Sequence, residues 1–201
     1  MQKKYIIFLL LSVLFIGCSR HYQTYNTNTP NVKLNLYGPY PIKNKTYKRY
    51  DVSIQQMPKD LSRNPTATAY AVLEATAKQV LKQGRRYFSI IYPQRLAHSS
   101  VHDLKTFQDT CIEHSYIHIG SIKRVPNSNS CGLTQQKSNY YGFKIRNYRG
   151  SISYVMYQTP PQGIVTWDAK RLLQEMDKEG LLLPRSYEWM DIHSKKLIFK
   201  D

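Results

Sequence analysis

The sequence predicts an α+β domain in which two main helices pack on an antiparallel or mixed sheet. Short apolar or alternating runs are typical of strands, and two longer capped segments have apolar residues at helical spacing. The signals follow one another as strand, helix, strand, further strands and helix. This order favours helices gathered against one sheet.

The first helix is predicted to start at Pro65, after Asn64 as its N-cap, and to end at Gly84 in a left-handed conformation. Its expected buried face holds Tyr70, Leu73, Ala77, Val80 and Leu81. The second helix is predicted over residues 167–178, with Thr166 as cap and Gly180 after its end. Its expected buried face holds Leu172, Leu173 and Met176, and Asp168 is an acid in its first turn. A short helix is expected around residues 101–107, capped by Ser99 or Ser100.

Strands are predicted where apolar residues alternate or form a short continuous run. The strongest hairpin signal is a pair of strands joined by a turn at Arg149 and Gly150, after a polar loop that contains Cys131. The run that ends at Pro93 is expected to be a buried central strand. The predicted strands are residues 46–57, 87–92, 113–124, 140–148, 151–158 and 196–199, and the polar loop is residues 126–139.

The first residues predict export. Lys3 and Lys4 precede an apolar run over residues 5–16, which Gly17 and Cys18 close. A basic start, a short apolar run and a small residue before the cut are typical of a secretory signal peptide. The run is shorter than the roughly 20 residues that a membrane-spanning helix needs.

This ending resembles a bacterial lipobox, in which the thiol is acylated before the signal is removed. The resemblance implies lipid attachment at Cys18, although Phe15 stands where that pattern usually has Leu. Two alternatives are an ordinary signal peptide with a coincidental cysteine and a non-cleaved anchor. The resulting domain organisation is a lipoprotein signal peptide over residues 1–17, a lipidated tether over residues 18–45 and one α+β domain over residues 46–201.

The charge balance is strongly basic, with 29 Lys and Arg against 13 Asp and Glu. Residues 19–45 hold no acid, which would place positive charge beside a membrane. Such a protein is drawn to anionic partners. The charge alone would suggest nucleic acid, but an exported chain would meet lipid headgroups, lipopolysaccharide, acidic glycans or acidic proteins, so we expect no nucleic-acid partner.

The three cysteines support the lipid anchor, because an odd count in an exported protein needs an explanation. With lipid on Cys18, the remaining Cys111 and Cys131 can form a disulfide in an oxidising compartment. A disulfide that closes a loop of this size stabilises the folded state by about 3 kcal/mol in chain-entropy estimates. The alternative is two unrelated thiols.

The order of elements resembles a group of small, uncharacterised bacterial envelope lipoproteins with an α/β sandwich. The resemblance rests on the lipobox, on the Ala-rich helix and apolar strand of residues 71–91, and on Trp167-Asp168-Ala169 at the start of the late helix. It implies architecture and location, and it implies no activity. The segment from Cys111 to Cys131 and the basic turn after the first helix depart from it.

Basic and aromatic residues alternate along the predicted hairpin. Lys144 and Arg146 would share one face, with Arg149 at the turn, and this face is a candidate anion-binding surface. The alternative is an ordinary solvated sheet face.

Four histidines within a short stretch suggest a metal site. His98 and His102 would share a helix face and could bind zinc, but His114 and His118 lie in a predicted strand, too far apart for one ion. The alternative is that all four are solvated or hydrogen-bonded. No motif of a serine hydrolase or zinc protease is present, so we expect no catalytic residues and no cofactor.

Two functions remain open. The first is a lipid-anchored envelope protein with a non-catalytic binding or assembly role, engaging lipopolysaccharide, peptidoglycan or an envelope protein complex. The second is a cell-envelope hydrolase, with or without the assistance of a metal ion. Ser19 is not the Asp that retains many lipoproteins in the inner membrane, which favours the outer membrane, facing the periplasm, over the inner membrane or cell surface.

Overall fold

The structure is a computed structural model that describes residues 31–43, 45–113, 131–140 and 143–199, with only the backbone of residues 59–60, 136–140 and 143–146. The predicted signal peptide, its lipobox and Cys18 lie outside these residues, as do the expected strand over residues 113–124, apart from Glu113, and both His114 and His118.

The described strands form one mixed sheet in the order β6-β3-β5-β2-β1-β7-β8, and β4 also pairs with β5. The strands are β1 (Asn31–Pro41), β2 (Lys48–Gln56), β3 (Tyr87–Tyr92), β4 (Leu133–Tyr140), β5 (Phe143–Tyr157), β6 (Trp167–Asp168), β7 (Glu188–Asp191) and β8 (Leu197–Phe199). Each pairing is antiparallel except that of β1 with β7, which is parallel.

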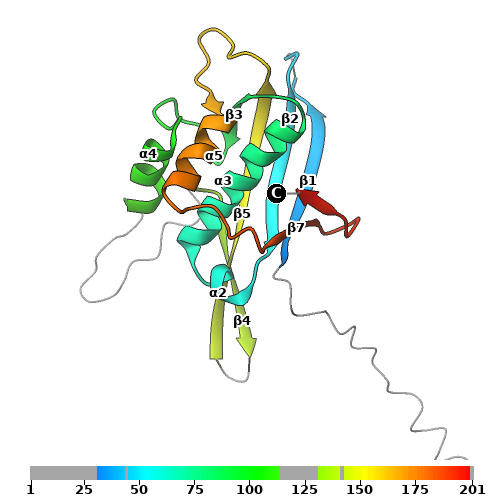
Figure 1. The fold of residues 1–201 in the computed structure, drawn as a ribbon, viewed down its shortest axis with the longest axis vertical. Helices are drawn as coiled ribbons and strands as arrows, with labels where there is room; N and C mark the ends of the chain where they lie inside the picture. Colours follow the sequence, from blue (N-terminus) through cyan, green and yellow to red (C-terminus); the bar gives the residue numbers. More distant parts are fainter. Residues whose placement is uncertain (1–30, 44, 114–130, 141–142, 200–201) are drawn as a thin grey trace, which may run out of the picture.

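The two longer helices lie on one side of this sheet, as Figure 1 shows. α3 packs against β5 and β2, and α5 packs beside α3. The helices are α2 (Lys59–Ser62), α3 (Pro65–Lys82), α4 (Leu104–Phe107), the π-helix η2 (Gln108–Glu113) and α5 (Ala169–Lys178). The predicted α+β class, with a mixed sheet and two main helices packed on it, is confirmed.

The start of α3 is as the sequence predicts. The Asn64 side-chain oxygen accepts hydrogen bonds from the backbone N–H groups of Thr66 and Ala67, at 3.0 and 3.2 Å. Pro65 occupies the first helical position, where its missing N–H would have no partner in any case.

The ends of both helices are also confirmed. Gly84 has a φ of +68°, its N–H donates to the Leu81 carbonyl, and the Arg85 N–H donates to the Val80 carbonyl. These two bonds close the last turn and satisfy carbonyls that the helix leaves unpaired. Gly180, with a φ of +66°, ends α5 in the same way.

The predicted apolar face of α3 lies in the core, apart from Leu81, which is 36% exposed. The helix also buries four polar side chains. These are Thr68, Glu74, Thr76 and Gln79.

The tether predicted over residues 18–45 is wrong for Asn31–Pro41, which forms β1 inside the sheet. Val32 and Leu34 are fully buried, and Leu36 packs against the same core. These three residues alternate at strand spacing, and the surrounding Asn, Lys and Pro residues obscured that signal.

The hairpin turn predicted at Arg149 and Gly150 is also wrong. β5 passes through both residues without a break, and the hairpin is instead formed with β4, which occupies the second half of the expected loop over residues 126–139. A Cβ at position 150 would lie 3.0 Å from two side-chain atoms of Val72 on α3. The glycine therefore serves a close approach of helix to sheet, and not a turn.

Two predicted caps are replaced by nearby aspartates. Asp103 caps α4 in place of Ser99 or Ser100, and its side chain accepts from the Thr106 N–H at 2.9 Å. Asp168 caps α5 in place of Thr166. The two residues before α5 pair with β3 as β6, which keeps them out of the helix.

The remaining strands match in part. The strand signal at residues 87–92 is confirmed as β3, although Ile91 and Tyr92 at its end are exposed. The C-terminal signal is confirmed as β8, whereas β7 was not predicted.

Candidate functional site

The predicted anion-binding residues are only partly described. Lys144 and Arg146 lie on β5, in the half that pairs with β4, and their side chains lie outside the described part of the structure. Arg149 is within the strand, and its Nη1 donates to Gln55 Oε1 on β2 at 3.1 Å. The predicted anion-binding face therefore stays a prediction.

The two described candidates for the metal site do not share a helix. His98 lies in the turn before α4, and its Nδ1 is 2.9 Å from Ser100 Oγ. His102 precedes the helix, with its Nε2 3.7 Å from Asp103 Oδ2. Among the described residues no group of three His, Cys, Asp or Glu side chains could hold a metal ion.

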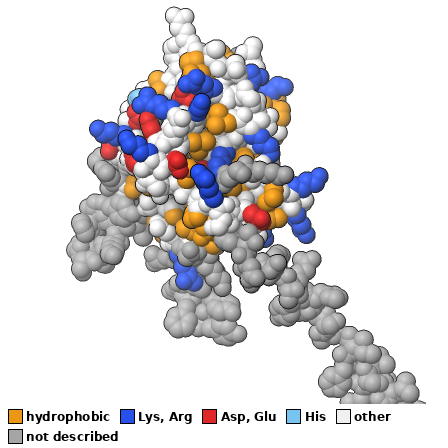
Figure 2. All heavy atoms as spheres, viewed as in Figure 1, with side chains coloured by type: hydrophobic (Ala, Val, Ile, Leu, Met, Phe, Trp, Pro, Cys, Tyr) orange, Lys and Arg blue, Asp and Glu red, His pale blue; other side chains and the backbone are white. Residues whose placement is uncertain are grey.

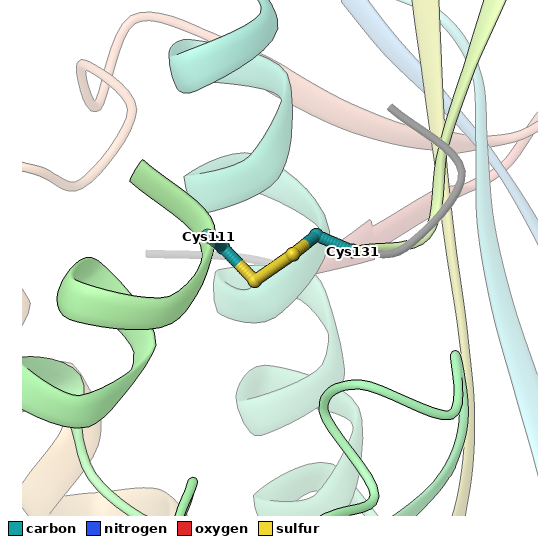
Figure 3. The surroundings of a disulfide bond; sticks show 2 residues. All are labelled: Cys111 and Cys131. Carbon is teal, nitrogen blue, oxygen red and sulfur yellow. A yellow bond between two sulfur atoms is a disulfide. The ribbon is translucent and has the colours of Figure 1, made fainter. Parts of the chain in front are cut away.

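The predicted disulfide between Cys111 and Cys131 is present (Figure 3). It joins η2 to the residue that comes two positions before β4, and the two cysteines are 2% and 1% exposed. It therefore fixes the base of the β4–β5 hairpin to the helical layer.

The described surface also contains a cationic pocket of about 540 Å³ at the end of the sheet where β2 begins and β5 ends. Lys48 and Arg85 are exposed and contribute its two charges, and none of its lining residues is acidic. The pocket, which we call the cationic pocket, is lined by Thr46, Tyr47, Lys48, Tyr50, Arg85, Met156, Tyr157, Gln158, Thr159 and Pro161.

The two cations come from the ends of two different elements, α3 and β2. Arg85 follows Gly84 at the C-terminal end of α3, where the helix dipole favours a positive charge. Lys48 is the first residue of β2 and lies just outside the pairing of β2 with β5, which begins at Arg49. Their guanidinium and ammonium groups, with hydroxyl groups from tyrosines and threonines around them, suit an anionic group such as a phosphate or carboxylate.

An apolar groove of about 640 Å³ adjoins this pocket. Its rim includes Ile91, Ile164 and Val165, which are 41%, 42% and 43% exposed, while Val155 beneath them is only 4% exposed. The groove, which we call the apolar groove, is lined by Ile42, Lys45, Tyr47, Ser89, Ile90, Ile91, Ala97, Ser99, Val155, Tyr157, Gly163, Ile164 and Val165.

The loop that carries two of these residues is fixed to the sheet. Ser89 Oγ on β3 donates to the Val165 carbonyl at 2.8 Å, and the Ile164 N–H donates to the Pro161 carbonyl at 3.3 Å. The exposed apolar side chains therefore project from an anchored loop. Exposed apolar residues that gather in one patch are typical of a contact or ligand site.

The cationic pocket and the apolar groove share two wall residues, Tyr47 and Tyr157, whose rings meet edge to face with centroids 4.9 Å apart. Burial raises the pKa of Tyr157, so its hydroxyl stays protonated at neutral pH. We call the two together the paired pockets. Their chemistry changes across this contact from charged and polar to apolar.

The paired pockets lie at the end of the fold away from Asn31. In Figure 1 the connection from β1 to β2 and the loop of residues 159–166 lie at the top, whereas β1 begins at its lower end, on the side of the β4–β5 hairpin. Figure 2 shows that basic side chains are spread over the helical face of the molecule, with fewer acidic side chains among them.

A smaller polar pocket of about 160 Å³ lies between the start of α5 and the start of α4. Its acids already have partners within the fold. Burial alone would raise the pKa of Asp168, but the hydrogen bonds from Arg86 and from the backbone N–H groups of Arg171 and Lys170 outweigh it and hold the pKa below its usual value. The Arg86 Nη2 lies 2.7 Å from Asp168 Oδ2. This charge cluster caps and positions α5.

Sequence reasoning missed the paired pockets, because their residues come from five separate segments. The available signals were local: Tyr47 and Lys48 at a strand start, and the apolar pair of Ile164 and Val165 in a loop that otherwise holds Pro, Gly, Gln and Thr. Neither signal shows that the segments meet.

No protein-family model, curated protein or solved structure matches this chain. Among the described residues, no helix combines the length and apolar character that crossing a membrane requires.

Proposed function

We propose that this chain is a lipid-anchored protein of the bacterial cell envelope that binds an anionic component through the cationic pocket, without catalysis. The observation that carries the proposal is the pairing of Lys48 and Arg85 in a pocket with no acidic lining residue. The lipobox at Cys18 supports the anchor, and the net charge of +16 supports an anionic partner.

The pocket suits binding better than reaction. It offers fixed positive charges and neutral hydroxyl groups, but its lining holds no histidine, carboxylate or cysteine that could act as a general base or nucleophile. Nothing in the described residues favours the hydrolase that the sequence left open, so we do not propose it.

The binding test uses the mature protein and fluorescent lipopolysaccharide at low ionic strength. Replacing both Lys48 and Arg85 with Ala should weaken binding at least about tenfold, because hydrogen bonds to charged groups contribute about 1.5–3 kcal/mol each. The affinity of the unchanged protein should also fall as salt is added.

The matched control removes two charges elsewhere. Lys105 and Lys170 are exposed on α4 and α5, and neither lines the cationic pocket or the apolar groove. Replacing both with Ala lowers the net charge equally and should change the affinity less than about twofold, since diffuse surface charge contributes little per residue. Equal weakening by both double variants would show that binding follows net charge and not this pocket.

The anchor is tested separately. Labelling of cells with radioactive palmitate should mark the wild-type protein and leave Cys18→Ala unlabelled. The labelled protein should fractionate with the outer membrane, as Ser19 after the lipidated cysteine implies. Label retained by the alanine variant would remove the anchor from the proposal.

A further inference from the structure

We infer that the paired pockets bind one single-chain phosphate lipid, with its phosphate in the cationic pocket and its acyl chain in the apolar groove. This inference rests on the proposed anion binding and specifies the ligand. It is carried by the contact of two opposite chemistries at Tyr47 and Tyr157, which line both cavities.

The charge distribution sets the orientation of the ligand. Lys48 and Arg85 lie in the cationic pocket, whereas the apolar groove has a single charged residue, Lys45, in its lining. An anionic headgroup is therefore favoured in the cationic pocket, and not in the apolar groove on the other side of Tyr47 and Tyr157. A purely polar anion, such as a free sugar phosphate, would leave the adjoining apolar surface in contact with water.

The apolar groove suits a flexible hydrocarbon chain. Ile91, Ile164 and Val165 are each exposed by about two-fifths in the free protein, so covering them removes apolar surface from water on both partners. Its volume of about 640 Å³ lies within the roughly 300–1,000 Å³ range of small-ligand sites. One acyl chain fits this description better than the broad surface of a bilayer.

The position of the paired pockets supports a single lipid molecule as the occupant. They lie at the end of the fold opposite Asn31, where the chain continues toward Cys18. The end of the fold that leads to the proposed anchor at Cys18 is therefore not the end that holds the paired pockets. A ligand there would be a lipid taken out of a membrane, and not the anchoring bilayer itself.

The test titrates the mature protein with hexyl, octyl and decyl phosphate below their micelle concentrations, using calorimetry. Because each buried methylene group contributes about 0.8 kcal/mol, affinity should rise up to about fourfold per added carbon until the apolar groove is filled. Glycerol phosphate should bind more weakly than any of the three.

Two variants separate the two halves of the site. Replacing Ile164 and Val165 with Ser should flatten the dependence on chain length but keep the preference for phosphate over a neutral alkyl glucoside. Replacing Lys48 and Arg85 with Ala should remove the preference for phosphate but keep the dependence on chain length. Ile192→Ser, which changes a 36% exposed apolar residue outside both cavities, is the control and should change neither property.

The outcomes distinguish this inference from the proposed function. Phosphate binding that does not depend on chain length would overturn the lipid assignment and leave anion binding intact. Binding of an acidic apolar peptide in place of every alkyl phosphate would identify a protein partner instead. No binding of alkyl phosphate, glycerol phosphate or lipopolysaccharide at low salt would overturn both.

Discussion

Glu74 is a fully buried acid in the middle of α3, and removing its charge should destabilise the fold strongly. Its Oε1 lies 3.1 Å from Lys78 Nζ, and its Oε2 accepts from the Leu183 N–H at 2.9 Å. The Lys78 side chain is only 17% exposed and lies over the Trp189 ring, 5.4 Å from its centroid. Glu74→Gln keeps the side-chain volume and removes the ion pair with Lys78.

Breaking a buried ion pair by removing one partner costs about 3–5 kcal/mol. For a domain of this size, each kcal/mol shifts the melting temperature by roughly 2–4 °C, so Glu74→Gln should lower it by roughly 6–20 °C. We expect a cost near 3 kcal/mol, and hence a shift near the lower end of this temperature range, because the partly exposed Lys78 can reach water. The assay is thermal and urea unfolding of the mature protein, followed by circular dichroism.

The chain provides a matched control in α5. Arg171 and Glu175 also form an ion pair four residues apart, at 2.7 Å, but their side chains are 72% and 32% exposed. Glu175→Gln should therefore cost less than about 1 kcal/mol. Adding Lys78→Met to Glu74→Gln should recover much of the loss, because replacing a buried ion pair by apolar side chains of similar volume is often close to neutral. Equal costs at positions 74 and 175 would refute the role assigned to burial.

Three further outcomes are expected from the mature protein. Gly150→Ala should cost about 1–3 kcal/mol in urea unfolding, because its Cβ would lie 3.0 Å from Val72 atoms; an unchanged midpoint would mean that α3 does not approach β5 so closely. Replacing both Cys111 and Cys131 with Ala should lower the free energy of unfolding by about 3 kcal/mol, and the wild type with reductant should match this variant. Because the folded-state pKa of Asp168 lies below the unfolded value of about 3.9, its contribution is present above that pH and is lost as pH falls through the folded pKa. Asp168→Asn should therefore differ most from wild type at neutral pH and converge with it in acid, and a constant difference across this range would contradict the assignment.

The sequence predicted the features that depend on neighbouring residues. Asn64 with Pro65 fixed the start of α3, and Gly84 and Gly180 marked the helix ends, because capping uses atoms within one turn. The alternation around β2 and the apolar run of β3 were also sufficient.

The wrong predictions concern features set by distant contacts. Glycine is common in turns, which is why a turn was predicted at Gly150. Its small size is needed there for another reason, because Val72 approaches from α3. The polar residues around the apolar positions of β1 obscured its strand pattern. Its place in the sheet depends on pairing with β2 and β7, which are distant in sequence from each other. The paired pockets could not be predicted, because Lys48, Arg85 and Tyr157 meet only when the sheet is assembled.

The parallel pairing of β1 with β7 has a consequence for how the chain reaches its final state. Asn31 aligns with Glu188, so the first described strand receives its second neighbour from a strand far along the sequence. Contacts between residues so far apart in sequence slow folding, because a very large loop must close before they form. One edge of β1 therefore stays uncovered until the C-terminal residues are present. A chain released N-terminus first would complete its sheet only after β7 and β8 had emerged.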